Sequence, residues 1–141
     1  MLLTDSGFWI ALGNTRDRHH AAALAAAKRW SGEGFVTTWP VLTEVTHLLV
    51  ARIGFHSALE FMDSVAQGAV EVPAPPDDAT IRAAYLMRRY RDLPMDLADA
   101  SLVILAEELE EGRILSTDLR DFGGYRWKNT QPFTNLLLPD F

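Results

Sequence analysis

Short apolar runs alternate along this chain with longer segments of helical character. Leu2-Leu3 leads into the polar turn Thr4-Asp5-Ser6, a pattern typical of a strand that ends at a turn. Further strands are predicted at residues 35–38, 69–72 and 113–117, and an edge strand in the tail between Trp127 and Leu138. Helices are predicted over residues 17–30, 40–52, 57–66, 77–90 and 97–109.

This alternation predicts an α/β fold: a three-layer α/β/α sandwich with a mainly parallel central sheet. The length of 141 residues suits one domain, residues 1–141, because it can bury one core but is short for two. Folds of this class place their active sites beyond the carboxyl ends of the strands. The residues that follow the predicted strands are therefore the first candidates for chemistry.

The amino-acid composition excludes several classes of function. The chain has no cysteine, which excludes a disulfide scaffold, thiolate zinc sites and a cysteine nucleophile. No apolar run reaches the length of about 18 residues that a membrane span needs, so we expect a soluble cytoplasmic protein. The net charge of −6 argues against broad non-specific nucleic-acid binding. It is also the balance expected of carboxylates grouped around divalent cations.

Two carboxylates directly follow predicted strands. Asp5 comes after the first strand and Asp118 after the strand Ile114-Leu115-Ser116-Thr117. If these strands are parallel neighbours, both side chains open into one crevice. Each taken alone is better explained as an ordinary turn residue, because aspartate is favoured there.

Three further acids lie on predicted helices. Asp96 and Asp99 are three residues apart at the start of an apolar helix and share one face, although helix capping explains them as an isolated pair. Glu44 lies at the margin of a buried stripe formed by Val41, Val45 and Leu48, where a solvated glutamate is also common.

The combination of acids suits one type of chemistry. Hydrolysis of a phosphodiester needs an activated water and neutralisation of phosphoryl charge, and one or two divalent ions can supply both. Mg²⁺ and Mn²⁺ prefer carboxylate oxygens. The four histidines show no zinc spacing, and the glycine-rich motifs that hold nucleotide phosphates are absent from the sequence.

Four segments in this order resemble the PIN domain, and most closely the VapC-like toxins of bacterial toxin–antitoxin pairs. The segments are Leu-Leu-Thr-Asp-Ser at 2–6, Thr-Glu-Val at 43–45, Pro-Met-Asp-Leu-Ala-Asp-Ala-Ser-Leu-Val-Ile-Leu-Ala at 94–106 and Ser-Thr-Asp-Leu-Arg-Asp-Phe at 116–122. They span nearly the whole chain.

The resemblance implies a metal-dependent endoribonuclease in which Asp5, Glu44, Asp99 and Asp118 are the catalytic, metal-binding acids. It implies Asp96 as a supporting metal acid, Mg²⁺ or Mn²⁺ as cofactor, tRNA or rRNA as substrate, a homodimer, and a cognate antitoxin as protein partner. Ser6 and Thr117 match the small hydroxyl residues that flank the family's acids. Asp121 lies three residues after Asp118, so the resemblance leaves open which acid of this turn faces the metal. The alternatives are a structure-specific DNA nuclease and a catalytically inactive PIN-like module that binds RNA or protein.

RNA binding would need basic or aromatic residues around the acids. The basic candidates are Arg88, Arg89, Arg91, Arg120, Arg126 and Lys128, although such runs are usually solvated faces. Trp9, Trp39 and Trp127 could stack on bases, yet large aromatics are more often core residues.

Overall fold

The computed structural model describes residues 1–138 and contains a parallel central sheet. Its strands are β1 (Leu2–Thr4), β2 (Phe35–Val36), β3 (Arg113–Leu115) and β6 (Thr134–Asn135), in the spatial order β2-β1-β3-β6. In the register, Leu3 of β1 lies opposite Val36 on one side and Ile114 on the other. The ends of β1 and β3 are therefore neighbours, which confirms the parallel arrangement expected from the sequence.

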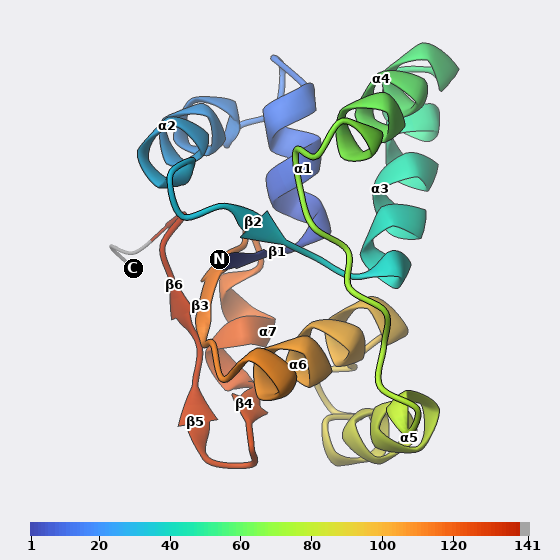
Figure 1. Cartoon of the computed structure of the whole chain (residues 1–141), viewed down its shortest axis with the longest axis vertical. Helices are drawn as coiled ribbons and strands as arrows, with labels where there is room; N and C mark the ends of the chain where they lie inside the picture. The colour runs from blue at the N-terminus through green and yellow to red at the C-terminus, as the bar shows by residue number, and fades with distance from the viewer. Residues whose placement is uncertain (139–141) are drawn as a thin grey trace.

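Helices cover both faces of this sheet (Figure 1). One face carries α1 (Ser6–Gly13), α2 (His20–Trp30), α3 (Trp39–Arg52) and α4 (Phe55–Ala66). The other carries α5 (Ala79–Arg89), α6 (Leu97–Leu109) and α7 (Leu119–Gly124). Right-handed crossovers explain why α1 and α2, which connect β1 to β2, lie on the opposite face from α5 and α6, which end the return from β2 across β1 to β3. The fold is the predicted three-layer sandwich.

The core lies between the sheet and the helices that contact it. The middle strands β1 and β3 are almost fully buried, and α6 is apolar on nearly all sides, with seven buried residues. Such a helix must be covered all round. In Figure 1, α6 lies between α5 and the strands. Its amino-terminal end therefore stays fixed relative to the ends of the strands.

Most predicted elements are confirmed with shifted ends, and the helix over 97–109 matches in full. One strand prediction is wrong: at 69–72 the structure has only an isolated bridge between Val36 and Glu71. The tail forms the short edge strand β6, preceded by a hairpin of β4 (Arg126–Trp127) and β5 (Gln131–Pro132) that was not predicted. Helices α1 and α7 were also not predicted. Both begin immediately after a candidate site aspartate.

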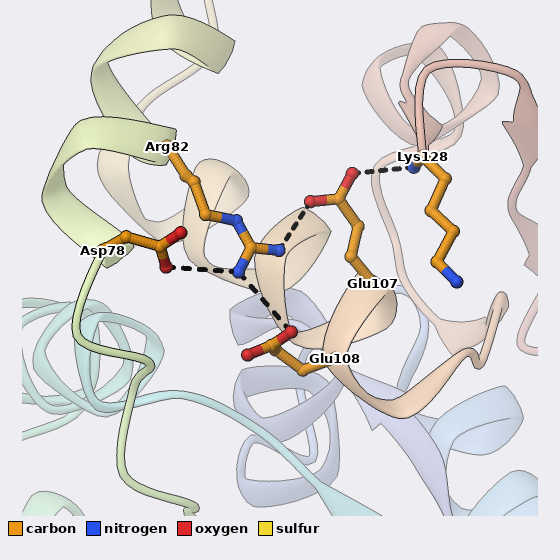
Figure 2. A network of polar contacts seen from close by, with 5 residues as sticks. All are labelled: Asp78, Arg82, Glu107, Glu108 and Lys128. Atoms are coloured by element: carbon orange, nitrogen blue, oxygen red, sulfur yellow. Dashed lines mark hydrogen bonds and ion pairs between the residues drawn. The ribbon is translucent and has the colours of Figure 1, made fainter.

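A charged network joins α5 to α6 and to the hairpin turn (Figure 2). The Arg82 guanidinium lies 2.9 Å from Glu107, 3.4 Å from Asp78 and 3.5 Å from Glu108. The second carboxylate oxygen of Glu107 accepts the Lys128 backbone N–H at 2.7 Å. Glu107 and Glu108 thus have a structural role away from the candidate site. Within residues 1–138, no helix has the length and apolar character to cross a membrane.

Candidate active site

Asp5 is a buried carboxylate at the junction of β1 and α1. Its side chain is only 6% exposed. One oxygen, Oδ1, caps α1 by accepting the Phe8 N–H at 3.1 Å, and Oδ2 accepts a hydrogen bond from the Ser116 hydroxyl. The capping interpretation and the site interpretation of Asp5 are therefore compatible, because the two oxygens have different partners.

Ser116 connects the ends of β1 and β3. While its hydroxyl donates to Asp5, it also accepts the Asp118 backbone N–H at 2.9 Å. The Asn135 side chain holds the Ser116 backbone on both sides, accepting its N–H at 3.2 Å and donating to its carbonyl at 2.9 Å. Asp118 itself caps α7 by accepting the Asp121 N–H at 3.0 Å. Two strand-end acids are thus fixed relative to each other through one buried serine.

Asp99 and Asp96 lie at the start of α6, as predicted. Asp96 is the helix cap, and its Oδ1 accepts the Asp99 N–H at 2.8 Å. The Asp99 carboxylate is half-buried, and its Oδ2 accepts the hydroxyl of Tyr125 at 2.7 Å. Tyr125 is fully buried, with its ring packed edge-on against Tyr90 and Phe122. One oxygen of Asp99 is therefore held by a rigid phenol.

Glu44 reaches the same region from α3. Its carboxylate is half-buried and accepts a hydrogen bond from the hydroxyl of Ser6, the residue after Asp5. The start of α3 is joined to α6 by a 2.6 Å contact between the hydroxyls of Thr38 and Ser101. Both helices are thus held in place where they carry an acid.

Burial raises the pKa values of two of these acids, and repulsion from their acidic neighbours adds to the effect. Burial raises the pKa of Asp5 to about 7, opposed by the hydrogen bonds from Ser116 and Phe8 and reinforced by the charges of Asp118 and Glu44. Burial likewise raises the pKa of Asp99 to about 7, with the Tyr125 hydrogen bond opposing and Asp96, Asp118 and Asp121 reinforcing. Asp118 acts on both groups, which places all the candidate acids in one electrostatic cluster.

Asp121 belongs to this cluster as well. Burial raises its pKa to about 6, assisted by the adjacent Asp118 and opposed by the positive charge of Arg120. The turn after β3 thus presents two carboxylates, and Asp118 is the one whose backbone is tied to Ser116.

The donor set fits a hard divalent cation. It consists of carboxylate oxygens from four helix starts or strand ends, and such like charges gain stability when a cation lies between them. Within residues 1–138, no three carboxylate or imidazole groups gather closely enough to enclose an ion. The chemistry of the donors, and not their spacing in this structure, is therefore what supports a divalent cation.

The basic candidates divide into paired and open groups. Arg89 donates to the side chain and carbonyl of Asn129, Lys128 pairs with Glu110 at 2.5 Å, and Arg126 donates to backbone carbonyls. Arg88 and Arg91 line an open pocket near the end of α5, together with Arg89 and Tyr85.

Sequence reasoning missed Ser116, Tyr125 and Asn135. Thr117 was singled out as the hydroxyl beside Asp118, whereas the Asp5 contact comes from Ser116. Alternation along the extended chain is a signal for Ser116. It lies two residues before Asp118, and residues two apart share one face of a strand. No local pattern points to Tyr125, which meets Asp99 from 26 residues away.

The chain resembles known proteins in both sequence and structure. No family model matches the chain. It is 26% identical over 125 residues to Ribonuclease VapC26 of Mycobacterium tuberculosis, covering 89% of this chain and 92% of the relative. It also superposes on the crystal structure of M. tuberculosis VapC20, described as a sarcin–ricin loop cleaving toxin, with a TM-score of 0.74 and 23% identity. That match covers 85% of this chain and 92% of VapC20. The chain is thus similar in sequence to a VapC ribonuclease and has the PIN-domain fold of a VapC toxin.

Proposed function

We propose that this protein is a metal-dependent endoribonuclease that acts as the toxin of a toxin–antitoxin pair. The observation that carries the proposal is the mutual electrostatic influence of four acids: Asp5 and Asp118 after the strands β1 and β3, Glu44 on α3, and Asp99 at the start of α6. The names of the two relatives support the same chemistry, since one is a ribonuclease and the other cleaves an RNA loop.

The four acids would hold Mg²⁺ or Mn²⁺, with Asp96 in support. When bound, such an ion neutralises phosphoryl charge and makes water a better nucleophile at neutral pH. The protein fixes the geometry: Ser116 orients Asp5, Tyr125 orients Asp99 and Ser6 orients Glu44. Partners of this kind restrict the orientations of the three carboxylates, which lowers the cost of ordering them around an ion.

Three further features belong to the proposal. The substrate is a structured RNA, either rRNA or tRNA, and the inhibitor is a small antitoxin protein. The active form is a homodimer. Sequencing of the fragment ends after cleavage of total RNA identifies the substrate, and light scattering of the purified protein measures its oligomeric state.

Cleavage of cellular RNA tests the main proposal. Purified protein is incubated with total bacterial RNA in Mn²⁺, Mg²⁺ or EDTA, beside Asp5→Asn and the matched variant Asp63→Asn, an exposed acid on α4. We expect defined fragments with metal from the wild type and Asp63→Asn, and none with EDTA or from Asp5→Asn. Absence of cleavage with either metal, together with an unchanged melting temperature on Mn²⁺ addition, would favour a binding module instead.

A further inference from the structure

Three tryptophans that could stack on bases have different environments in the structure. Trp9 is a core residue whose indole N–H donates to Thr4 at 2.9 Å. Trp127 lies in the hairpin, where its indole N–H donates to the Pro132 carbonyl at 3.1 Å. Trp39, the first residue of α3, is 67% exposed. Trp39 thus offers a broad aromatic surface to solvent, which is costly for so large an apolar group.

An open pocket of about 540 Å³ lies beside the Trp39 indole. Glu44 and Asp96, two of the candidate metal acids, line this pocket together with Leu97, which is 53% exposed. Thr43 and His47 of α3 add polar groups to its lining. The volume lies within the range of about 300–1,000 Å³ that is typical of small-molecule sites. The pocket therefore combines an apolar platform, hydrogen-bonding groups and the edge of the acidic cluster.

We propose that this pocket binds one unpaired nucleobase of the RNA, stacked on Trp39 and adjacent to the cleaved phosphodiester. The inference rests on the proposed RNA substrate. A phosphate held at the acidic cluster places the attached nucleoside within reach of a pocket whose lining includes Glu44 and Asp96. Proteins read unpaired bases in this way, stacking the base on an aromatic ring and bonding its edge with polar side chains.

A protein segment is the competing occupant, because Trp39 also borders a second groove. That groove, of about 350 Å³, is mostly apolar and is lined by the segment Pro73–Pro76 and by residues of α5 and α6 such as Leu109. It includes none of the candidate metal acids. The pocket beside Glu44 and Asp96 shares its lining with the acidic cluster, which favours a nucleobase there.

Binding of RNA to matched variants tests the proposal. All proteins carry Asp5→Asn so that the RNA stays intact, and the probe is a fluorescein-labelled single-stranded RNA of mixed sequence followed by fluorescence anisotropy. We expect Trp39→Ala to weaken binding by about 5- to 150-fold, which corresponds to about 1–3 kcal/mol for one stacked base. Trp39→Phe should retain most of the affinity. Ile81→Ala, which truncates a side chain that is 75% exposed on α5, should bind as the parent does.

The mapped cleavage site gives a second and more specific measurement. RNAs in which single nucleotides around the cut are abasic should lose affinity for the Trp39 protein at one position. Trp39→Ala should be insensitive to removal of that same base, because the two changes delete one contact.

Equal RNA affinity of Trp39→Ala and the Trp39 protein would overturn the proposal and leave the pocket to a protein partner. The anisotropy measurement gives an answer even if the protein does not hydrolyse RNA. If the protein with Asp5 intact cleaves no RNA with either metal while RNA affinity still depends on Trp39, the nuclease proposal is refuted and the base-binding pocket is still supported.

Discussion

The Ser116 hydroxyl donates a hydrogen bond to Asp5, the acid at the end of the neighbouring strand. The same hydroxyl accepts the Asp118 backbone N–H, so one buried oxygen fixes acids that are 113 positions apart in the chain. Because β1 and β3 are parallel neighbours, this serine lies where the two candidate metal acids meet. Ser116 caps neither α1 nor α7, so its two hydrogen bonds act on the relative positions of Asp5 and Asp118.

Removal of this hydroxyl should weaken the site. We expect Ser116→Ala to reduce metal affinity and RNA cleavage by about 10- to 100-fold, the usual effect of losing a partner that orients a ligand. It should also lower stability by about 1–3 kcal/mol, because a buried carboxylate oxygen and an N–H lose their partner. Cleavage rates across a Mn²⁺ titration and urea unfolding measure the two effects.

The matched control for Ser116→Ala is Ser64→Ala on α4, which removes a hydroxyl that bonds the Phe61 carbonyl far from the acids. It should leave the Mn²⁺ dependence unchanged. A Ser116→Ala protein with the Mn²⁺ dependence of the wild type would show that Asp5 is held without its serine partner.

Sequence patterns predicted the layers and proposed the candidate acids, whereas they did not predict the side chains that hold those acids. The apolar character of residues 97–109 and the glycine at 112 identified α6 in full, because a helix that is buried all round needs a long unbroken run of apolar residues. The helix α1 was missed because Phe8 to Leu12 is uniformly apolar and lacks helical periodicity. The strand predicted at 69–72 fails because only Glu71 reaches β2 before the proline-rich segment begins.

The Tyr125 hydroxyl gives a second prediction, about Asp99. Tyr125→Phe removes one oxygen and keeps the ring that packs against Tyr90 and Phe122. We expect about 10- to 100-fold weaker Mn²⁺ binding, because Asp99 loses the partner that fixes its orientation, with cleavage largely recovered at high Mn²⁺. Melting temperature across a Mn²⁺ titration, measured without RNA, checks the metal affinity directly.

Tyr90→Phe is the control for this change. Its hydroxyl accepts the Arg126 N–H at 3.1 Å, and its ring lies against Tyr125, yet its hydrogen bond is not to a site acid. Equal Mn²⁺ affinities of the two phenylalanine variants would attribute any defect to general packing and remove the proposed role of Tyr125 in orienting Asp99.

Gly7 gives a third prediction, because α1 passes very close to the residue before Asp118. A Cβ at Gly7 would lie 1.8 Å from the Thr117 hydroxyl oxygen and 3.0 Å from its Cβ. Gly7→Ala must therefore displace the turn after β3, and we expect a loss of about 1–3 kcal/mol in stability together with reduced cleavage. Thr117→Ala in the same protein removes the nearest atom and should restore part of both.

Gly13→Ala tests whether alanine in α1 is harmful in itself. At that position the nearest atom to a new Cβ is a Leu49 methyl at 3.9 Å, so the change should be neutral or slightly stabilising. If Gly7→Ala were as stable and active as Gly13→Ala, the close contact with Thr117 would have no influence on the site.

The raised pKa values of Asp5 and Asp99 predict that the metal-free protein loses stability as the pH rises. Each pKa is about 7 in the folded protein, against an ordinary value of 3.8, so the folded state binds more protons than the unfolded state between these limits. The stabilising contribution is complete below about pH 4 and is lost as the pH rises through 7. In EDTA, the melting temperature should fall from pH 5 to pH 8, by about 3–5 °C for each 1 kcal/mol lost. Asp5→Asn should flatten this dependence because its amide stays neutral, and Mn²⁺ should restore the wild type most strongly at pH 8, where the carboxylates are ionised. A melting temperature in EDTA that rises steadily from pH 5 to pH 8 would contradict the burial of uncompensated acids at this site.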